Sequence, residues 1–232
     1  MIKSFLILII FPIFLFSSQQ TILVVAQDFN SSHGKLEFYE DSTLLLRADV
    51  NLGTNGLAWG IGILPFKHKE GEPLKYEGDK RAPVGVFSLT DIFGYKEGAR
   101  FKLPYLYASK NLICVDDSES PFYNQIIESQ KKPKSFEYMR REDNQYRYGI
   151  TVAHNSKAIA GRGSCIFMHI QKSKGATTAG CTSMDESDLK KIISLLDSRK
   201  NPTLIQIPKS LTKRVLEIYP QLQNSSLLKR ED

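Results

Sequence analysis

A cysteine and a histidine in the C-terminal half of the chain have the types and spacing needed for nucleophilic chemistry. Cys181 ends the segment Thr-Ala-Gly-Cys at 178–181, and His169 lies near the end of the apolar stretch 167–170. A thiol becomes a good nucleophile as a thiolate, so it needs a base or a positive local potential. We therefore predict that Cys181 attacks a carbonyl carbon, while His169 takes the thiol proton and returns it to a leaving group.

The residues around Cys181 predict further assistance. Gly180 has no side chain, so a carbonyl carbon can approach the sulfur, and backbone N–H groups near 180–182 could bind the developing oxyanion. We expect Ser183 to cap a helix, with Glu186 completing a capping box. Cys181 would then lie at the positive end of that helix. The helix is indicated by an apolar face with helical spacing, made by Leu189, Ile192, Ile193 and Leu196.

The stretch 165–170 has the pattern of a strand. Cys165, Phe167 and His169 are expected on one face, with residues 166, 168 and 170 on the other. No Asp or Asn is placed to orient His169, so a backbone carbonyl is the expected partner. A core histidine beside a structural cysteine is the alternative, and it stays open on these two residues alone.

Five more residues are candidate substrate contacts. His154 follows a strand and could orient His169 or line the pocket, although a structural role explains it equally well. A zinc site is not expected, because the three cysteines lack paired short spacings. We expect no cofactor and no metal. The candidate substrate contacts are Thr178, Thr182, His154, Asn155 and Arg162.

Residues 1–20 have the pattern of a secretory signal peptide. Lys3 precedes an apolar run over 5–16, and Ser17 and Ser18 follow that run. The run is shorter than the roughly 20 residues that a membrane-spanning helix needs. An uncleaved membrane anchor is the alternative, because a clean small-x-small cleavage pattern is missing. In both cases we expect an exported protein, with a membrane involved only through this segment.

Export gives meaning to the three cysteines, because disulfides form in oxidising compartments. Cys114 and Cys165 lie in apolar, strand-like segments, so we expect them to be buried, with a disulfide between them as one option. Cys181 lies in a polar segment and is expected to be free. A disulfide that includes Cys181 would abolish the nucleophile and is the main structural alternative.

Composition and charge fit one globular domain. The chain has 232 residues, of which 41% are hydrophobic, a net charge of +6 and a mean hydropathy of -0.26. Basic residues are scattered among acidic ones, and the dense run at 131–134 suits a solvated loop. Nucleic-acid binding is therefore not expected. We expect the protein to be a monomer.

Short apolar segments bounded by turn residues predict a mainly β fold, a β-rich α+β domain with a mixed sheet or β-sandwich core. One helix is expected, the helix after Cys181. We place the domain at 21–208 and a polar tail at 209–232. Residues 116–147 are polar and long for a connection, so we predict an insert that acts as a lid, with some helix around 123–129.

The order of these motifs resembles the L,D-transpeptidase (YkuD-like) catalytic domain family, in its divergent branch. The family signature is a strand histidine, a variable loop and Ser/Thr-x-Gly-Cys, found here as His169 and residues 178–181. An upstream Thr-Pro-x-Gly-x-Phe element appears as Ala-Pro-Val-Gly-Val-Phe at 82–87, and the resemblance spans about residues 21–208. The chain departs from the usual pattern at Ile170, Ala179 and Ser183, where glycine, histidine and arginine are common.

The resemblance implies a β-rich fold and a cysteine acyl-enzyme. The usual substrate of the family is the stem peptide of peptidoglycan, attacked after the L-centre of meso-diaminopimelate, and the acyl group passes to an amine or to water. By position, Cys181 would be the nucleophile, His169 the base and Gly180 part of the oxyanion site. The departures leave nucleophile and base intact but bear on substrate and acceptor preference.

Three other functions are compared with this one. An L,D-carboxypeptidase or related cell-wall hydrolase would use the same site with water as acceptor. A non-catalytic wall-binding module would contain an unreactive Cys181. A papain-type protease is disfavoured, because its cysteine precedes its histidine in the chain and here the order is reversed.

Overall fold

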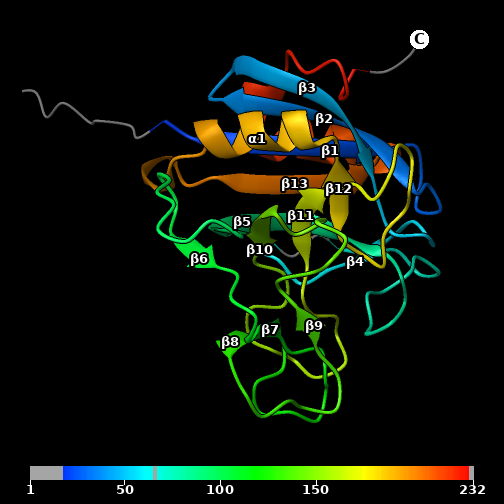
Figure 1. Ribbon diagram of the computed structural model, residues 1–232. Coiled ribbons are helices and arrows are strands. Elements are labelled where there is room, and N and C mark those ends of the chain that lie inside the picture. Colours follow the sequence, from blue (N-terminus) through cyan, green and yellow to red (C-terminus); the bar gives the residue numbers. More distant parts are fainter. Residues whose placement is uncertain (1–17, 65–66, 230–232) are drawn as a thin grey trace, which may run out of the picture.

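A computed structural model describes residues 18–64 and 67–229 (Figure 1). The predicted signal peptide or anchor lies outside the described residues, apart from its last three. Gln20, the final residue of that segment, is already the first residue of a strand. Within the described ranges, no helix has the length and apolar character needed to cross a membrane.

Eight strands form the main body and pair around a closed ring. The ring closes because β5 pairs with β10 as well as with β13. In this ring β1 pairs with β13 and β11 with β12 in parallel, and the other pairs are antiparallel, so the sheet is mixed as expected. In spatial order the strands are β10 (Tyr148–Val152), β11 (Phe167–Ile170), β12 (Thr182–Met184), β3 (Thr43–Asn51), β2 (His33–Glu40), β1 (Gln20–Ala26), β13 (Thr203–Pro208) and β5 (Ala82–Gly94).

Shorter strands extend this body. β4 (Leu57–Trp59) and β6 (Tyr105–Tyr107) run parallel to β5. A separate three-stranded sheet has β7 (Leu112–Cys114) between β8 (Ile126–Glu128) and β9 (Glu137–Tyr138). Figure 1 shows this small sheet below the main body, on the side of β10 and β11. Strands make up 36% of the structure and helices 12%, which confirms a mainly β fold.

The helix after Cys181 is present, but it begins later than predicted. α1 (Glu186–Leu195) buries Leu189, Ile192 and Ile193 in the main core, as their spacing predicts. Its N-cap is Asp185, whose carboxylate accepts the Ser187 N–H at 2.8 Å. The predicted cap at Ser183 is wrong, because residues 182–184 form β12 between β11 and β3.

The C-terminal segment differs from the expected polar tail. Short 3₁₀ turns at Ser198–Lys200, Lys209–Leu211 and Pro220–Leu222 accompany a second α-helix, α2 (Thr212–Ile218). Val215, Leu222 and Leu228 are buried in the main core. The segment after 208 is therefore packed against the domain by apolar side chains.

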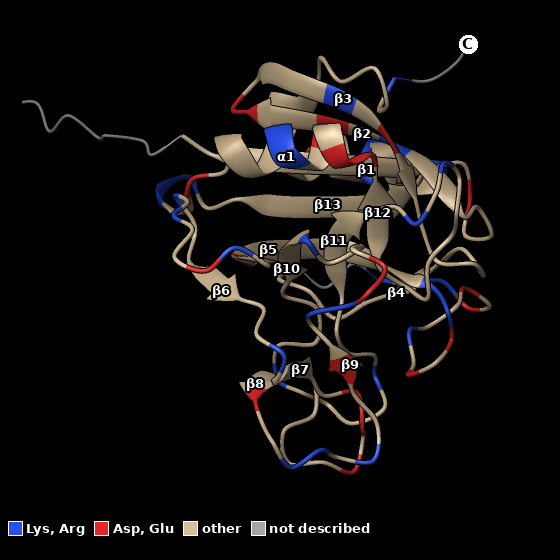
Figure 2. Ribbon diagram, in the orientation of Figure 1, with Lys and Arg blue, Asp and Glu red and all other residues tan. Residues whose placement is uncertain are grey.

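The insert at 116–147 contains strands and turns. The helix expected around 123–129 is wrong, because Ile126 pairs with Cys114 in an antiparallel ladder. Arg140 holds the insert against the body through hydrogen bonds from its guanidinium to the carbonyls of Ala108 and Tyr95, at 2.7 and 2.9 Å. Figure 2 shows basic and acidic residues interspersed along its loops.

Candidate active site

The alternation expected around His169 is confirmed. Ile166 and Met168 belong to the main core, whereas Cys165, Phe167 and Cys181 belong to a second apolar cluster beside the small sheet. β11 and β12 run parallel with Met168 opposite Thr182, and the Phe167 N–H donates to the Cys181 sulfur at 3.3 Å. The strand pairing thus brings Cys181 next to the strand that carries His169.

The Cys181 thiol is buried and hydrogen-bonded. It is 8% exposed and donates to the carbonyl of Cys165, with 3.6 Å between sulfur and oxygen. Burial raises its pKa to about 12, and the Glu137 carboxylate adds to the rise, while the Phe167 N–H and the Tyr146 hydroxyl oppose it. Among the described residues, no hydrogen bond joins Cys181 to His169. The resting site therefore holds a neutral thiol.

His169 has the backbone partner that the sequence predicts. Its Nδ1 lies 2.8 Å from the carbonyl oxygen of Ile170. Because a carbonyl only accepts, Nδ1 carries the proton and Nε2 is left as the acceptor. Burial lowers the pKa of His169 to about 4, so the ring is neutral near pH 7. A neutral imidazole with an open Nε2 is the form that a general base requires.

The cysteine pairing matches the option taken from the sequence. Cys114 and Cys165 form a disulfide with 6.0 Å between their Cα atoms, and Cys181 is free. The alternative with Cys181 in a disulfide is thereby excluded. The bond joins β7 of the small sheet to the residue that supplies the thiol's acceptor carbonyl, so it ties the insert to the nucleophile's surroundings.

The helix does not activate the thiol. Cys181 directly precedes β12, and α1 begins only after that strand and its cap Asp185. The positive potential of a helix N-terminus falls off within its first turn. The predicted helix contribution to the reactivity of Cys181 is therefore wrong, and the activating groups must come from elsewhere.

The turn before Cys181 explains its glycine and its threonine. Gly180 has a φ of +145°, and a Cβ there would lie 3.0 Å from the carbonyl oxygen of Arg81. Its N–H donates to the Thr178 hydroxyl at 3.0 Å, and that hydroxyl donates to the Cys181 carbonyl at 2.6 Å. Thr178 thus shapes the turn, and the Gly180 N–H can serve an oxyanion only by leaving this bond.

The other predicted substrate contacts hold the structure together. The Thr182 hydroxyl donates to the Gln206 side chain at 2.7 Å in the core. His154 accepts the Ile61 N–H at Nδ1 (3.3 Å), and its Nε2 lies 3.0 Å from the Arg162 carbonyl. Burial lowers the pKa of His154 to about 4. The structure does not bring these side chains to the Cys181–His169 pair.

The side chains of Asn155 and Arg162 bond backbone carbonyls in and around the loop 153–165. The Asn155 amide donates to the carbonyls of Ile159 and Gly163, at 2.9 and 3.0 Å, and the Arg162 Nε donates to the Lys75 carbonyl at 3.2 Å. Asn124 from the insert donates to the carbonyls of residues 154 and 155 and accepts the Cys165 N–H. These side chains fold the loop that presents Cys165 to the thiol.

Tyr146 and Glu137 are the residues at the site that sequence reasoning missed. The Tyr146 ring is buried and lies edge-on to His169, while its hydroxyl donates to the Glu137 carboxylate at 2.7 Å. Burial raises the pKa of Glu137 and raises that of Tyr146 well above its ordinary value. Tyr146 lies two residues before β10, whose Gly149 pairs with His169, and the sequence carries no signal of this contact.

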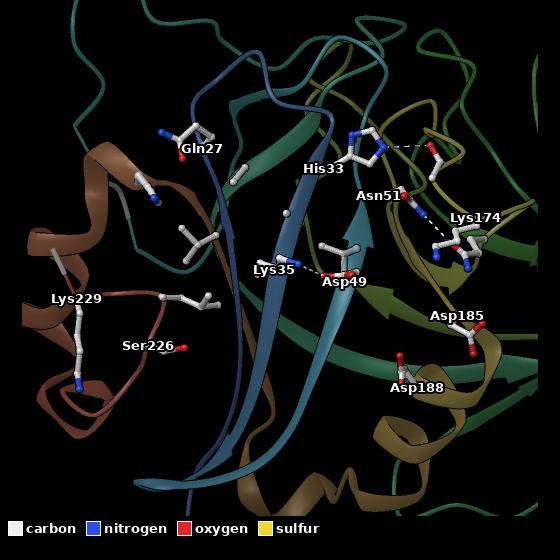
Figure 3. A pocket seen from close by; sticks show the side chains of 18 residues that line it. Gln27, His33, Lys35, Asp49, Asn51, Lys174, Asp185, Asp188, Ser226 and Lys229 are labelled. Carbon is white, nitrogen blue, oxygen red and sulfur yellow. Dashed lines mark hydrogen bonds and ion pairs between the residues drawn. The ribbon is translucent and has the colours of Figure 1, made fainter. Parts of the chain in front are cut away.

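A large groove lies away from this pair. It has a volume of about 920 Å³ and crosses β1–β3, the loop after β11 and the C-terminal segment (Figure 3). The Lys35–Asp49 pair and the Asn51–Gln171 hydrogen bond are among its lining contacts. Neither Cys181 nor His169 lines it. The groove is therefore no part of the candidate active site.

The fold and the site define a class: a mainly β domain with a free cysteine beside a strand histidine. Residues 24–207 match the L,D-transpeptidase (YkuD) catalytic domain, and the chain belongs to this family. It is thus an L,D-transpeptidase-type enzyme, of a family that acts on peptidoglycan peptides. No curated protein and no solved structure matches the chain with significant similarity.

Proposed function

We propose that this chain is an exported cysteine-dependent L,D-transpeptidase that acts on peptidoglycan stem peptides through a thioester acyl-enzyme. The observation that carries the proposal is the pairing of a free Cys181 with a His169 whose Nδ1 is occupied by the Ile170 carbonyl. That arrangement leaves Nε2 to exchange a proton with the thiol, and family membership supplies the substrate class.

The resting state sets the order of the first step. Because the thiol and the imidazole are both neutral, the proton leaves sulfur as the carbon–sulfur bond forms. Cys181 must first give up its hydrogen bond to the Cys165 carbonyl and turn toward Nε2 of His169. Sulfur then adds to the carbonyl carbon of the donor peptide, and Nε2 holds the proton.

Nε2 of His169 transfers a proton in each of the remaining steps. Nε2 returns it to the leaving amine as the carbon–nitrogen bond breaks, and a thioester on Cys181 remains. An acceptor amine then loses a proton to Nε2 and attacks the thioester, which releases the thiol. If water takes the place of that amine, the enzyme is an L,D-carboxypeptidase. The acceptor is therefore the point at which the two functions separate.

Export is supported by two independent features. The pattern of residues 1–20 is that of a secretory signal. A disulfide between Cys114 and Cys165 fits an oxidising compartment, such as the bacterial periplasm or cell envelope. Measurement of the disulfide in protein isolated from its source, with localisation by fractionation, tests this part of the proposal.

The reaction is tested with a disaccharide-tetrapeptide and product analysis by mass spectrometry. We expect a 3→3 cross-linked dimer from the natural chain and no product from the Cys181→Ala variant, whose fold is checked by circular dichroism. Tripeptide without dimer would assign the reaction to the carboxypeptidase. Neither product from folded natural protein, together with no selective alkylation of Cys181, would favour a non-catalytic wall-binding module.

A further inference from the structure

An arginine of the insert, Arg141, is held by hydrogen bonds to neighbouring residues. We call the network of Arg141, Asp143 and Gln145 the bracket. The guanidinium of Arg141 donates to both carboxylate oxygens of Asp143, with Nε–Oδ1 at 3.0 Å and Nη2–Oδ2 at 2.6 Å. Asp143 is held in turn by the backbone N–H and the side-chain amide of Gln145, at 3.2 and 2.5 Å. The Arg141 backbone N–H donates to the Tyr95 hydroxyl at 2.8 Å. The arginine is thus preorganised.

The bracket is joined to the catalytic base by two routes. The Ile170 N–H donates to the Gln145 carbonyl at 3.1 Å, and the carbonyl of that same Ile170 orients His169. The Arg141 guanidinium carbon lies 5.0 Å from the centre of the Tyr146 ring, whose edge faces His169. The cation therefore lies over the ring whose edge meets His169, and its positive charge contributes to the lowered pKa of that histidine.

One edge of the Arg141 guanidinium remains able to donate hydrogen bonds to a ligand. Asp143 occupies the Nε/Nη2 edge, and in the described part of the chain Nη1 makes no hydrogen bond. The Arg141 side chain is 37% exposed, so a ligand can reach it. The Nη1/Nη2 edge of an arginine matches the two oxygens of a carboxylate.

We propose that Arg141 binds the free C-terminal carboxylate of the acyl donor. This inference rests on the proposed function, because it names the donor of that same site. In a terminal residue the carboxylate is separated from the scissile nitrogen by one carbon. A cation near His169 can therefore meet that carboxylate when His169 protonates the leaving amine.

The first test uses the thiol alone and needs no turnover. Cys181 is alkylated with iodoacetate, an anion, and with iodoacetamide, its neutral analogue, and the rates are measured by mass spectrometry of the Cys181 peptide. Each reagent forms a carbon–sulfur bond and expels iodide, while the thiol proton passes to solvent. We expect Arg141→Gln to lower the iodoacetate-to-iodoacetamide rate ratio by about tenfold.

Arg147→Gln is the matched control, because Arg147 pairs with Glu186 on α1 away from the thiol. Arg147→Gln should leave the rate ratio unchanged. Arg141→Lys keeps the positive charge but loses the paired guanidinium N–H donors, so its ratio should lie between those of the natural chain and Arg141→Gln. If Arg141→Gln does not fold, the lysine variant and Asp143→Asn, which frees the bracket, decide instead. An unchanged ratio in every folded bracket variant overturns the inference.

The second test compares a donor tetrapeptide that ends in a carboxylate with the same peptide amidated at its C-terminus. We expect the natural enzyme to prefer the acid, and Arg141→Gln to raise KM for the acid and leave the amide unaffected. An equal loss for both peptides would contradict carboxylate binding. Absence of turnover with both peptides, despite an altered alkylation ratio, would instead contradict the proposed function.

Discussion

The edge of the Tyr146 ring packs against the imidazole of His169, with 5.2 Å between the ring centroids and 67° between the planes. The ring belongs to the insert and the imidazole to β11, so the insert forms a wall of the site. Tyr146 also adjoins the thiol, and its hydroxyl is fixed by Glu137. Substitutions in the insert should therefore change the reactivity of Cys181.

Two single substitutions should move that reactivity in opposite directions. Glu137 raises the pKa of Cys181 by its negative charge, so Glu137→Gln should lower that pKa and speed alkylation by iodoacetamide at pH 8. The Tyr146 hydroxyl lowers the pKa, so Tyr146→Phe should slow alkylation. A severalfold effect is expected for each, because one pKa unit is about a tenfold change in thiolate.

The pH profile of alkylation separates these effects from altered access. A changed pKa shifts the midpoint of the profile, whereas a changed opening of the site scales the rate at every pH. Tyr138→Phe, an exposed tyrosine of the same insert, is the control. Profiles with the same midpoint in both variants and in the natural protein would contradict the assignment.

Protonation of His169 should destabilise the fold in mild acid. Burial lowers its pKa to about 4, while an unfolded histidine titrates near 6.5. Between about pH 6.5 and 4 the histidine is protonated in the unfolded chain but not in the native chain. The free energy of unfolding therefore falls as the pH drops through this range. The difference corresponds to about 3 kcal/mol for a single histidine.

Denaturant unfolding measured at several pH values checks this expectation. Burial also lowers the pKa of His154 to about 4, so the natural chain should lose stability in acid through both histidines. His169→Gln should remove one of the two contributions and flatten the dependence between pH 6.5 and 4. The same slope in the variant and in the natural chain would show that His169 has the same pKa in the folded and the unfolded chain.

Loss of the disulfide should weaken the fold and loosen the insert. Cys114 and Cys165 are 51 positions apart, and a cross-link across such a loop contributes about 4 kcal/mol in the chain-entropy description. We expect the Cys114→Ala/Cys165→Ala variant to melt at a lower temperature and its insert to be cut earlier by protease. Both chains should carry Cys181→Ala, so that the free thiol cannot form a new bond. Equal melting temperatures would contradict the prediction.

The C-terminal segment should contribute to stability through Glu37. Burial alone would raise the pKa of this carboxyl, but hydrogen bonds from Ser225 and Ser226, with Tyr39 and Arg47, lower it to about 2. The serine hydroxyls lie 2.6 and 2.5 Å from its oxygens. Ser225→Ala with Ser226→Ala should lower the free energy of unfolding by about 2 kcal/mol or more, because each bond serves a buried charge.

Ser156→Ala is a suitable control for the serine variants, since its exposed hydroxyl bonds only a backbone carbonyl among the described contacts. Equilibrium unfolding in urea measures the difference. A double variant as stable as the natural chain would mean that the segment after 208 packs by its apolar residues alone.

Local patterns predicted the elements that carry the site. The alternation at 165–170 placed Phe167 and Cys165 on the thiol side, and the spacing of Leu189, Ile192 and Ile193 gave α1. Both patterns arise from burial of one face, which a sequence records residue by residue. The start of α1 was misplaced because Ser183 and Asp185 are both good caps, and only pairing with β11 and β3 decides between them.

Long-range contacts were beyond prediction. Nothing near Tyr146 indicates that its ring meets His169, because that contact depends on how the insert folds back after β9. His154 and Asn155 looked available for substrate because they are polar and follow a strand. Their side chains are used by backbone groups of their own loop, and a sequence does not show which polar groups are already satisfied.

The position of the free cysteine has a consequence for biosynthesis. Cys114 and Cys165 pair, and Cys181 comes last in the chain. Three pairings are open to an oxidant, and two of them consume the nucleophile. A chain that emerges from its N-terminus exposes the two structural cysteines first, so the harmless bond can form before the third thiol arrives. The order in which the cysteines appear can thus protect Cys181 from disulfide formation until the other two cysteines have paired.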